Sequence, residues 1–363
     1  MELSPERIEN YLKSVLGERI TLRTITVLGE SADDRKQKKI GYGTPIRVEY
    51  ESAAGERKSV VLHTMGASHF GHEHMSDRAQ ILLWQRDAFN RLSRHIRALD
   101  AGTIQTGGTP ASLGSPEEFF LLTEFAEGAG YFEDLERIAK TGVATEQDVA
   151  RADALCDYLV DIHRVPGTDG ELYVRRIREL VGHGECIMGI ADSFAATSFH
   201  PADELRQIEH LCVGWRWRLK CRAHRLRQVH GDFHPWNILF REGADFTVLD
   251  RSRGDFGDPA DDVACLTMNY VFFSLECGGR LEGAFEMLFR RFWDRYLEKS
   301  GDREILEVVA PFFVFRALVL ASPVWYPNLA ETIRRQLFAF SFAVLSSNSF
   351  DPAQVNRYCG IED

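Results

Sequence analysis

A chain of 363 residues is long enough for two lobes, each with a core of its own. The hydrophobic share of 44% and the charged share of 27% are those of an ordinary soluble globular protein. A net charge of −11 disfavours nucleic acid and anionic membranes as partners and mildly favours cationic small molecules, because the summed field attracts them.

The first quarter of the chain has the pattern of strands with one helix. Three segments have the β-rich composition of strands: residues 21–30, 45–52 and 59–65. A helix is predicted over residues 76–99, with Ser76 as its N-cap, because apolar residues recur there at helical spacing. The stretch "EFFLLTEFAEG" (118–128) is expected to be a further strand that runs into a glycine.

From about residue 130 onward the pattern is mainly helical. Helices are predicted over residues 146–164, 202–228, 261–276, 281–299, 303–320 and 328–346. The strand signals in this half are "NILF" and "FTVLD". We therefore predict an α+β chain, with a small antiparallel β-sheet lobe carrying one helix over residues 1–126 and a large, mainly helical lobe over residues 127–363.

The stretch "VHGDFHPWNILF" (229–240) places polar residues directly before an apolar run with the pattern of a strand. Together with "REGAD" and "FTVLD" it predicts a β-hairpin. The start of one hairpin strand lies beside the end of the other, so Asn237 and Asp250 are expected together, with Asp232 on the loop over them. Their oxygens suit Mg²⁺, which takes few protein ligands and shares phosphate oxygens. Asp232 could accept a proton from an attacking hydroxyl.

This spacing resembles the catalytic loop of protein kinases, in which Asp-x-x-x-x-Asn is followed by a metal-binding Asp. The wording "HGDFHPWN", with "GDPADDVA" downstream, more specifically resembles the aminoglycoside phosphotransferase family, which also includes choline and homoserine kinases. The resemblance implies a two-lobed protein-kinase-like fold, with ATP or GTP as phosphoryl donor. Asp232 would be the catalytic residue, and Asn237 and Asp250 the Mg²⁺ ligands. A literal "DFG" starts at Asp255, but we take it as coincidence because Asp250 closes the strand at the right distance.

Two features favour a small-molecule acceptor over a protein. The stretch between His163 and His230 resembles the helical insertion of small-molecule kinases and exceeds the short link of protein kinases. Asp258 and Asp262 follow Asp250 almost at once, which leaves no long activation segment. We expect Asp262 to hold the catalytic loop structurally. The acidic net charge and several aromatic residues favour an amine-bearing acceptor, such as an aminoglycoside or an amino alcohol.

The resemblance also implies a nucleotide site, which the residues mark less clearly. In "LLTEFAEG", main-chain groups around Glu124, Phe125 and Ala126 would bind the adenine edge. A loop between the first two strands, with Gly41 and Gly43, would cover the phosphates, although a turn is an equally good explanation of these glycines.

The phosphate-binding Lys that the family carries on its third strand is missing, and His63 stands in its place. A neutral His can donate a hydrogen bond, but near pH 7 it supplies only part of a positive charge. Three lysines of the glycine loop are alternative phosphate ligands: Lys36, Lys38 and Lys39.

Three functions are compatible with these residues. The leading one is ATP- and Mg²⁺-dependent phosphorylation of a hydroxyl on a small molecule. The second is a nucleotide-binding or regulatory pseudokinase that lost turnover together with its Lys. The third is a metallophosphoesterase, since Asp232-Phe-His234 is D-x-H and "GDPAD" is G-D-x-x-D, but the Gly-Asn-His expected with those motifs is absent from the sequence.

Cysteine usage and the chain's apolar runs point to a cytoplasmic protein. The seven Cys are odd in number and form no C-x-x-C pair, so we expect buried thiols in a reducing compartment. The N-terminal stretch has acids early and no apolar core, unlike a signal peptide. The longest apolar run is broken by Pro311, Arg316 and Pro323, so a membrane span is not expected.

Overall fold

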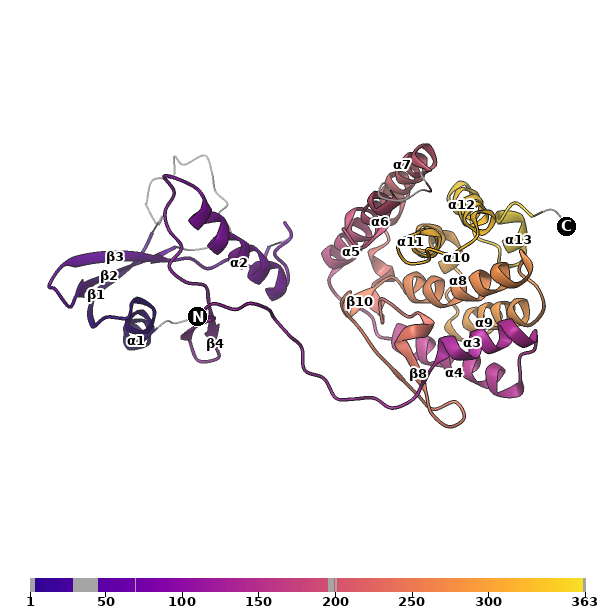
Figure 1. Cartoon of the computed structure of the whole chain (residues 1–363), viewed down its shortest axis with the longest axis horizontal. Coiled ribbons are helices and arrows are strands. Elements are labelled where there is room, and N and C mark those ends of the chain that lie inside the picture. Colours follow the sequence, from indigo (N-terminus) through magenta and orange to yellow (C-terminus); the bar gives the residue numbers. More distant parts are fainter. Residues whose placement is uncertain (1–3, 29–44, 69, 195–198, 200, 362–363) are drawn as a thin grey trace. The chain divides into compact units, whose positions relative to one another are not determined.

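The chain divides into two compact units, Met1–Thr123 and Glu124–Asp363. The computed structural model, drawn in Figure 1, describes residues 4–28, 45–68, 70–194, 199 and 201–361. The described part of the chain contains antiparallel sheets together with many helices, so the predicted α+β class is confirmed. The two units are taken in turn below.

Unit 1 is built on a three-stranded antiparallel sheet in the order β1–β2–β3. Its strands are β1 (Ile20–Val27), β2 (Ile46–Ser52) and β3 (Arg57–Leu62). Helix α1 (Pro5–Leu16) covers the sheet and ends at Gly17, whose left-handed φ of 66° suits a residue without a Cβ. A small core results, made by Ile8, Leu12, Ile20, Val48 and Tyr50.

The sequence-based elements of unit 1 are partly confirmed. The three predicted strands form, although residues 29–30 lie outside the described part of the chain. The predicted helix is α2 (Met75–Arg91), but its N-cap is His74 and not Ser76, because Asp77 accepts a hydrogen bond from the His74 backbone N–H. It also ends before residue 92. A hairpin of β4 (Gly102–Gln105) and β5 (Thr109–Ser112) was not foreseen.

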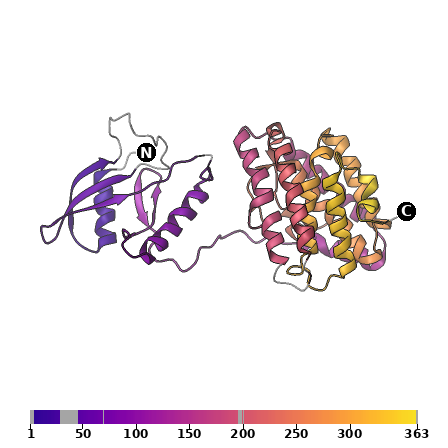
Figure 2. The same ribbon diagram turned by 90° about the horizontal axis from the view of Figure 1, so that it is seen from above.

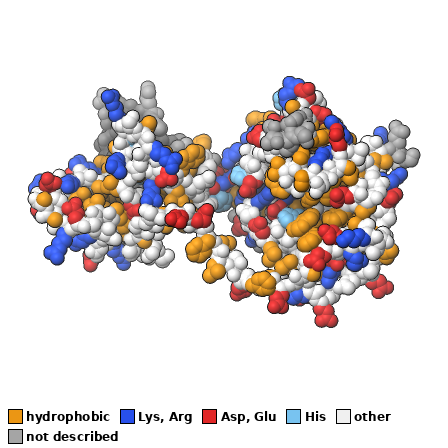
Figure 3. Space-filling view, in the orientation of Figure 1, with side chains coloured by type: hydrophobic (Ala, Val, Ile, Leu, Met, Phe, Trp, Pro, Cys, Tyr) orange, Lys and Arg blue, Asp and Glu red, His pale blue; other side chains and the backbone are white. Residues whose placement is uncertain are grey.

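The strand expected over residues 118–128 is wrong. Residues 118–127 have no regular secondary structure, and pairing begins at β6 (Ala129–Gly130). A strand needs a neighbouring strand to bond its backbone groups, and in the described residues the only ladder near this segment is that short one. Apolar side chains such as Phe120 and Phe125 are exposed along the segment, as the hydrophobic atoms in Figure 3 show.

Two small sheets are present in the described residues of unit 2. In one, β8 (Ile238–Phe240) lies between β6 and β9 (Phe246–Val248). In the other, β7 (Arg227–Gln228) pairs antiparallel with β10 (Phe256–Gly257). The predicted hairpin of "NILF" and "FTVLD" is therefore present as β8 and β9.

Helices make up most of unit 2, and Figure 2 shows them packed side by side. Their bounds are α3 (Tyr131–Thr141), α4 (Glu146–His163), α5 (Gly170–Gly182), α6 (Ile187–Ser193), α7 (Ala202–Leu219), α8 (Pro259–Gly278), α9 (Gly283–Ser300), α10 (Ile305–Val308), α11 (Ala310–Ala321), α12 (Glu331–Ser346) and α13 (Val355–Tyr358). Single 3₁₀ turns cover Ala223–Arg225, Pro235–Asn237 and Pro352–Gln354. The helix predicted over 202–228 ends early at Leu219, and the one over 303–320 is divided into α10 and α11, where Pro311 occupies the first turn of α11.

The core of unit 2 lies where α8 packs against α9 and α11, with α4 on α9 and α12 on α11. Its largest fully buried side chains include Trp293, Tyr270 and Phe313. All seven cysteines are free thiols, and the expectation that they are buried fails for Cys221 and Cys277, which are exposed. None of the helices in the described ranges combines the length and apolarity that crossing a bilayer requires.

Candidate active site

The β8–β9 hairpin brings the two predicted metal ligands to one end of a sheet. Ile238 pairs with Val248, and one step further the Leu249 backbone N–H donates to the Asn237 carbonyl at 2.8 Å. Asp250 is the next residue, and it adopts a left-handed φ of 52°. A non-glycine residue takes this conformation only at a cost, and such residues cluster at functional sites. The structure thus places Asn237 and Asp250 together, as the spacing predicts.

Asp262, in the first turn of α8, forms hydrogen bonds with the backbone of the loop before β8. Its carboxylate accepts hydrogen bonds from the backbone N–H groups of His230 (2.8 Å) and Gly231 (2.7 Å). His163 lies 3.1 Å from the same carboxylate, and its other ring nitrogen bonds Tyr296. Burial alone would raise the pKa of Asp262, but these bonds hold it below the ordinary value. Asp262 therefore fixes the loop, as expected, and the His230 ring also makes a structural hydrogen bond, because its Nδ1 accepts from the Asp232 backbone N–H at 3.3 Å.

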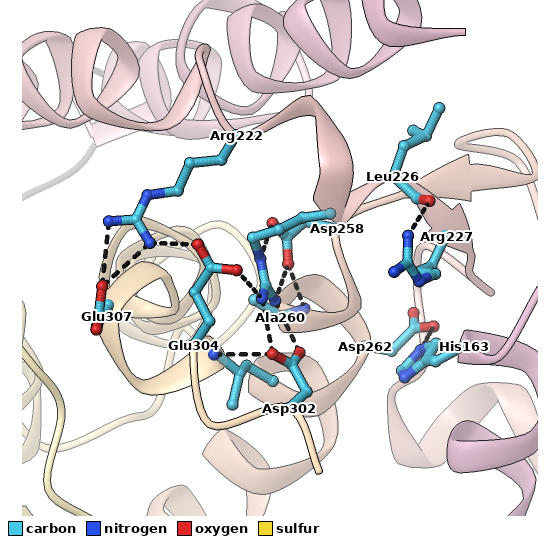
Figure 4. Close-up of polar contacts among 12 residues, drawn as sticks. His163, Arg222, Leu226, Arg227, Asp258, Ala260, Asp262, Asp302, Glu304 and Glu307 are labelled. Atoms are coloured by element: carbon cyan, nitrogen blue, oxygen red, sulfur yellow. Dashed lines mark hydrogen bonds and ion pairs between the residues drawn. The ribbon is translucent and has the colours of Figure 1, made fainter. Parts of the chain in front are cut away.

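The start of α8 is anchored by a buried ion pair. Asp258 caps the helix by accepting from the Ala260 N–H at 3.0 Å, and it also accepts from the Tyr173 hydroxyl at 2.8 Å. Arg225 donates to both Asp258 oxygens at 2.9 Å, through Nε and Nη2, and its Nη1 and Nη2 also donate to Asp302. Figure 4 labels Asp258, Ala260 and Asp302 of this network, together with its outer members Arg222, Glu304 and Glu307. Because α8 carries Asp262, the network indirectly places the catalytic loop.

The Asp232 side chain projects from this loop toward Arg316 of α11 and His234. Its Oδ1 accepts a hydrogen bond from Arg316 of α11 at 2.5 Å, while its Oδ2 lies 3.7 Å from His234 Nε2. Burial alone would raise the pKa of Asp232, but Arg316 and Arg253 outweigh it and hold the pKa below its usual value. Burial lowers the pKa of His234, so that ring is neutral near pH 7. An ionised carboxylate beside a neutral imidazole can accept a proton.

The oxygen atoms at the hairpin end are suitable ligands for a hard cation. The Asn237 side-chain N–H donates to the Asp232 carbonyl at 3.1 Å, which directs the Asn237 amide oxygen away from the loop. Asp250 is exposed, and no described residue donates a hydrogen bond to its carboxylate. An amide oxygen and a carboxylate are ligands that Mg²⁺ accepts, so Asn237 and Asp250 could hold this ion beside the phosphates of a nucleotide. Larger clusters of three His, Cys, Asp or Glu are absent from the described residues.

The literal Asp-Phe-Gly lies elsewhere in this unit. The Asp255 carbonyl accepts from the Val229 backbone N–H at 3.0 Å, and the following Phe256 pairs with Gln228 in the β7–β10 ladder. Arg251, the residue after Asp250, donates to the carbonyls of Val229 and Asp255. Its side chain thus fastens the segment after Asp250 to the strand that leads into the catalytic loop.

The residues assigned to the nucleotide are less informative. Glu124, Phe125 and Ala126 open unit 2 without regular secondary structure. His63 directly follows β3 in unit 1. Gly41 and Gly43 lie outside the described residues, as do the three loop lysines. The roles assigned to all of these residues stay predictions.

Sequence reasoning missed the role of Arg316. Arg316 donates to Asp232 and to Asp261, which is the residue before Asp262 in the first turn of α8. Burial raises the pKa of Asp261, and the neighbouring Arg316 only partly offsets that rise. The sequence marks Arg316 only as a single charge inside the apolar run of α11. From the sequence, such a charge indicates no more than that the run is not a membrane span.

The site combines a carboxylate on a fixed loop with an Asn and an Asp at the end of a hairpin. Kinases use this arrangement for phosphoryl transfer. The chain belongs to the phosphotransferase enzyme family, whose sequence model matches residues 85–298. No match was found among curated proteins.

Solved structures with partial likeness include three enzymes. A Plasmodium vivax ethanolamine kinase shares 11% identity over 93% of this chain and 80% of its own, with a TM-score of 0.34. An amicoumacin kinase in complex with AMP-PNP, Ca²⁺ and Ami shares 14% over 91% of each chain, with a TM-score of 0.41. The aminoglycoside phosphotransferase APH(3″)-Id from Streptomyces rimosus shares 16% over 86% of this chain and 99% of its own, with a TM-score of 0.36. The family assignment rests on the family model alone.

Proposed function

We propose that this protein transfers the γ-phosphoryl group of ATP, or of GTP, to a hydroxyl group of a small molecule in an Mg²⁺-dependent reaction. One observation carries the proposal. Asn237 and Asp250 lie together at one end of the β8–β9 hairpin, and Asp232 lies on the preceding loop, which Asp262 fixes by two backbone hydrogen bonds.

Asp232 has the central role in the proposed step. Its carboxylate orients the acceptor hydroxyl and takes the proton as the acceptor oxygen attacks the γ-phosphorus. The new P–O bond forms in line with the bond to the β-phosphate oxygen, which breaks and releases the nucleoside diphosphate. Asn237 and Asp250 would hold Mg²⁺, which neutralises charge on the phosphates. Because the chemistry needs little beyond position and charge, a loop without freedom to move is an asset.

The acceptor is proposed to carry an amine, as in an aminoglycoside or an amino alcohol. This preference rests on the net charge of −11 and on the aromatic residues of the chain, and no described contact in the site selects an amine. Two arginines, Arg316 and Arg253, lie close enough to Asp232 to lower its pKa, so the immediate surroundings of the base are not acidic. A screen for the acceptor therefore has to include neutral and acidic hydroxyl compounds as well as amines.

An ATP-consumption screen over aminoglycosides, choline, ethanolamine, other amino alcohols, sugars and hydroxy acids tests the proposal. We expect at least one acceptor to raise nucleoside diphosphate release above the protein-only rate, and Asp232→Asn to remove that increase. Phosphorylated product identified by mass spectrometry would establish the transfer. Mg²⁺-ATP binding without turnover on any acceptor would instead favour the pseudokinase, in which His63 marks the lost lysine.

A further inference from the structure

Arg316 is a charged residue in the middle of an apolar helix. Nearly all of α11 is buried in the core of unit 2, and Arg316 itself is only 6% exposed. Burial of a guanidinium is costly unless the charge is paired and its N–H groups are bonded. The position of Arg316 therefore needs an explanation in terms of its partners.

The partners of Arg316 are concentrated at the catalytic loop. One terminal nitrogen donates to Asp232 Oδ1 at 2.5 Å. The other donates to the Gly231 carbonyl at 3.1 Å and to Asp261 at 2.7 Å. The guanidinium also lies over the ring of Phe315, 4.5 Å from its centroid. The planar guanidinium of Arg316 thus connects the loop backbone, the loop carboxylate and the first turn of α8.

This contact makes the two oxygens of Asp232 unequal. Oδ1 is occupied by Arg316, and Oδ2 remains, 3.7 Å from the nearest ring nitrogen of His234. The side-chain torsion of an Asp carboxylate is broad, so without Arg316 the carboxylate plane could rotate and neither oxygen would keep a fixed position. A misplacement of about 1 Å at a reacting group costs on the order of 10²-fold in rate.

We propose that Arg316 is the positioning residue of Asp232, and that it presents Oδ2 as the oxygen that takes the acceptor's proton. The inference rests on the proposed phosphotransferase function. Arg316 touches neither acceptor nor nucleotide in this scheme and acts only through the carboxylate. The competing explanation is that Arg316 simply ties α11 to α8 and the loop.

Steady-state kinetics with an acceptor from the screen separate the two. We expect Arg316→Met to lower kcat by about 10- to 100-fold while KM for Mg²⁺-ATP changes by less than about twofold. Arg316→Lys keeps the charge but cannot make all three contacts, so its kcat should lie between those of the parent and Arg316→Met. Asp261→Asn is the matched control, since it removes a partner of the same guanidinium that is not the base. Its kcat should stay within about threefold of the parent.

A double-mutant cycle gives the sharpest readout. If Arg316 acts only through the Asp232 carboxylate, Arg316→Met should reduce the residual kcat of Asp232→Asn no further. Two results would overturn the inference and leave Arg316 as a structural contact. In the first, the kcat losses of Arg316→Met and Asp232→Asn multiply in the double variant. In the second, Asp261→Asn and Arg316→Met lower kcat equally. Should Arg316→Met fail to fold, the same cycle is run with Arg316→Lys.

Failure of the proposed function is recognised separately. The same cycle is measured on urea unfolding, which needs no turnover and reports whether Arg316 and Asp232 are coupled. Coupled unfolding in a parent that phosphorylates no acceptor would refute both the phosphotransferase proposal and the positioning role. Turnover in the parent with an uncoupled cycle would refute the positioning role alone.

Discussion

Asp232 shows how a single loop residue can have two functions. The sequence suggests that a loop carboxylate supports no core and that its removal should leave the fold intact. The structure differs, because Asp232 neutralises the buried Arg316, and its side chain is only 13% exposed. Removing one partner of such a pair leaves a charge with poorer compensation.

Asp232→Asn should therefore lower kcat by roughly 10²–10⁴-fold, the range for a positioned general base. Asp232→Ala should do the same and should also lower the free energy of unfolding, by about 1–3 kcal/mol, because a charged donor loses one of its acceptors. Kinetics and urea unfolding measure the two effects. Turnover within about tenfold of the parent would show that Asp232 is not the base.

The two candidate metal-binding aspartates can be told apart by substitution. Asp250 ends the hairpin beside Asn237, whereas Asp255 precedes the β7–β10 ladder and uses its carbonyl to bond Val229. Asp250→Asn should weaken Mg²⁺-ATP binding at least about tenfold, since a carboxylate ligand is lost, and Asp255→Asn should change it little. Isothermal titration of both variants decides the matter. The reverse order of effects would move the metal site to the literal Asp-Phe-Gly.

At the scale of elements, the start of α4 depends on a capping box. The Thr145 hydroxyl accepts from the Asp148 backbone N–H at 3.3 Å, and the Asp148 carboxylate accepts from the Thr145 backbone N–H at 2.6 Å. Arg137 of α3 also donates to Asp148. Burial would raise the pKa of Asp148, but the Thr145 and Arg137 hydrogen bonds outweigh it and lower the pKa.

This lowered pKa gives a pH-dependent prediction. A carboxylate with a folded-state pKa below its unfolded value stabilises the fold fully above the unfolded value, which is about 3.9 for Asp. The stabilisation disappears as the pH falls through the folded-state pKa. Asp148→Asn should thus reduce the free energy of unfolding by about 1–2 kcal/mol at pH 7, and by progressively less below about pH 4. Urea unfolding across this range measures the difference, and a constant difference would contradict the prediction.

At the scale of the whole molecule, each unit has a core of its own. The buried residues of unit 1 form a small cluster around α1 and the β1–β3 sheet, and those of unit 2 form a much larger one among the helices. The proposed active-site residues Asp232, Asn237 and Asp250 all belong to unit 2. A ligand that binds the folded chain there should raise its stability by mass action.

Saturating Mg²⁺-ATP should therefore raise the unfolding temperature of the full chain. When the concentration of Mg²⁺-ATP is about a hundredfold above Kd, the folded state is stabilised by about 2.7 kcal/mol. The unfolding temperature of a domain of the size of unit 2 rises by about 2–4 °C for each kcal/mol. Differential scanning fluorimetry measures the shift. ATP with EDTA, and Asp250→Asn with Mg²⁺-ATP, are the controls and should shift far less. An unchanged midpoint with the parent would contradict nucleotide binding.

Local features of the fold and site follow from the sequence by itself. Asn237 and Asp250 are close in the chain, so a turn and two strands bring them together, and that geometry could be predicted from spacing. The amphipathic and apolar helices of unit 2 were predicted for the same reason, with errors mainly at their ends. The strand over residues 118–128 failed because its composition could not say whether a partner strand would be present.

Only the tertiary structure decided which distant side chains meet. Arg316 lies 84 positions from Asp232, and Arg225 lies 33 positions from Asp258. The chain has 43 Lys and Arg and 54 Asp and Glu, so composition and periodicity cannot select these pairs. The selection comes from packing, because α8 and α11 must bury their apolar faces against each other and in doing so set Arg316 against Asp232 and Asp261. A local motif can thus be recognised in the sequence, whereas the residue that positions its carboxylate becomes visible only once the helices are packed.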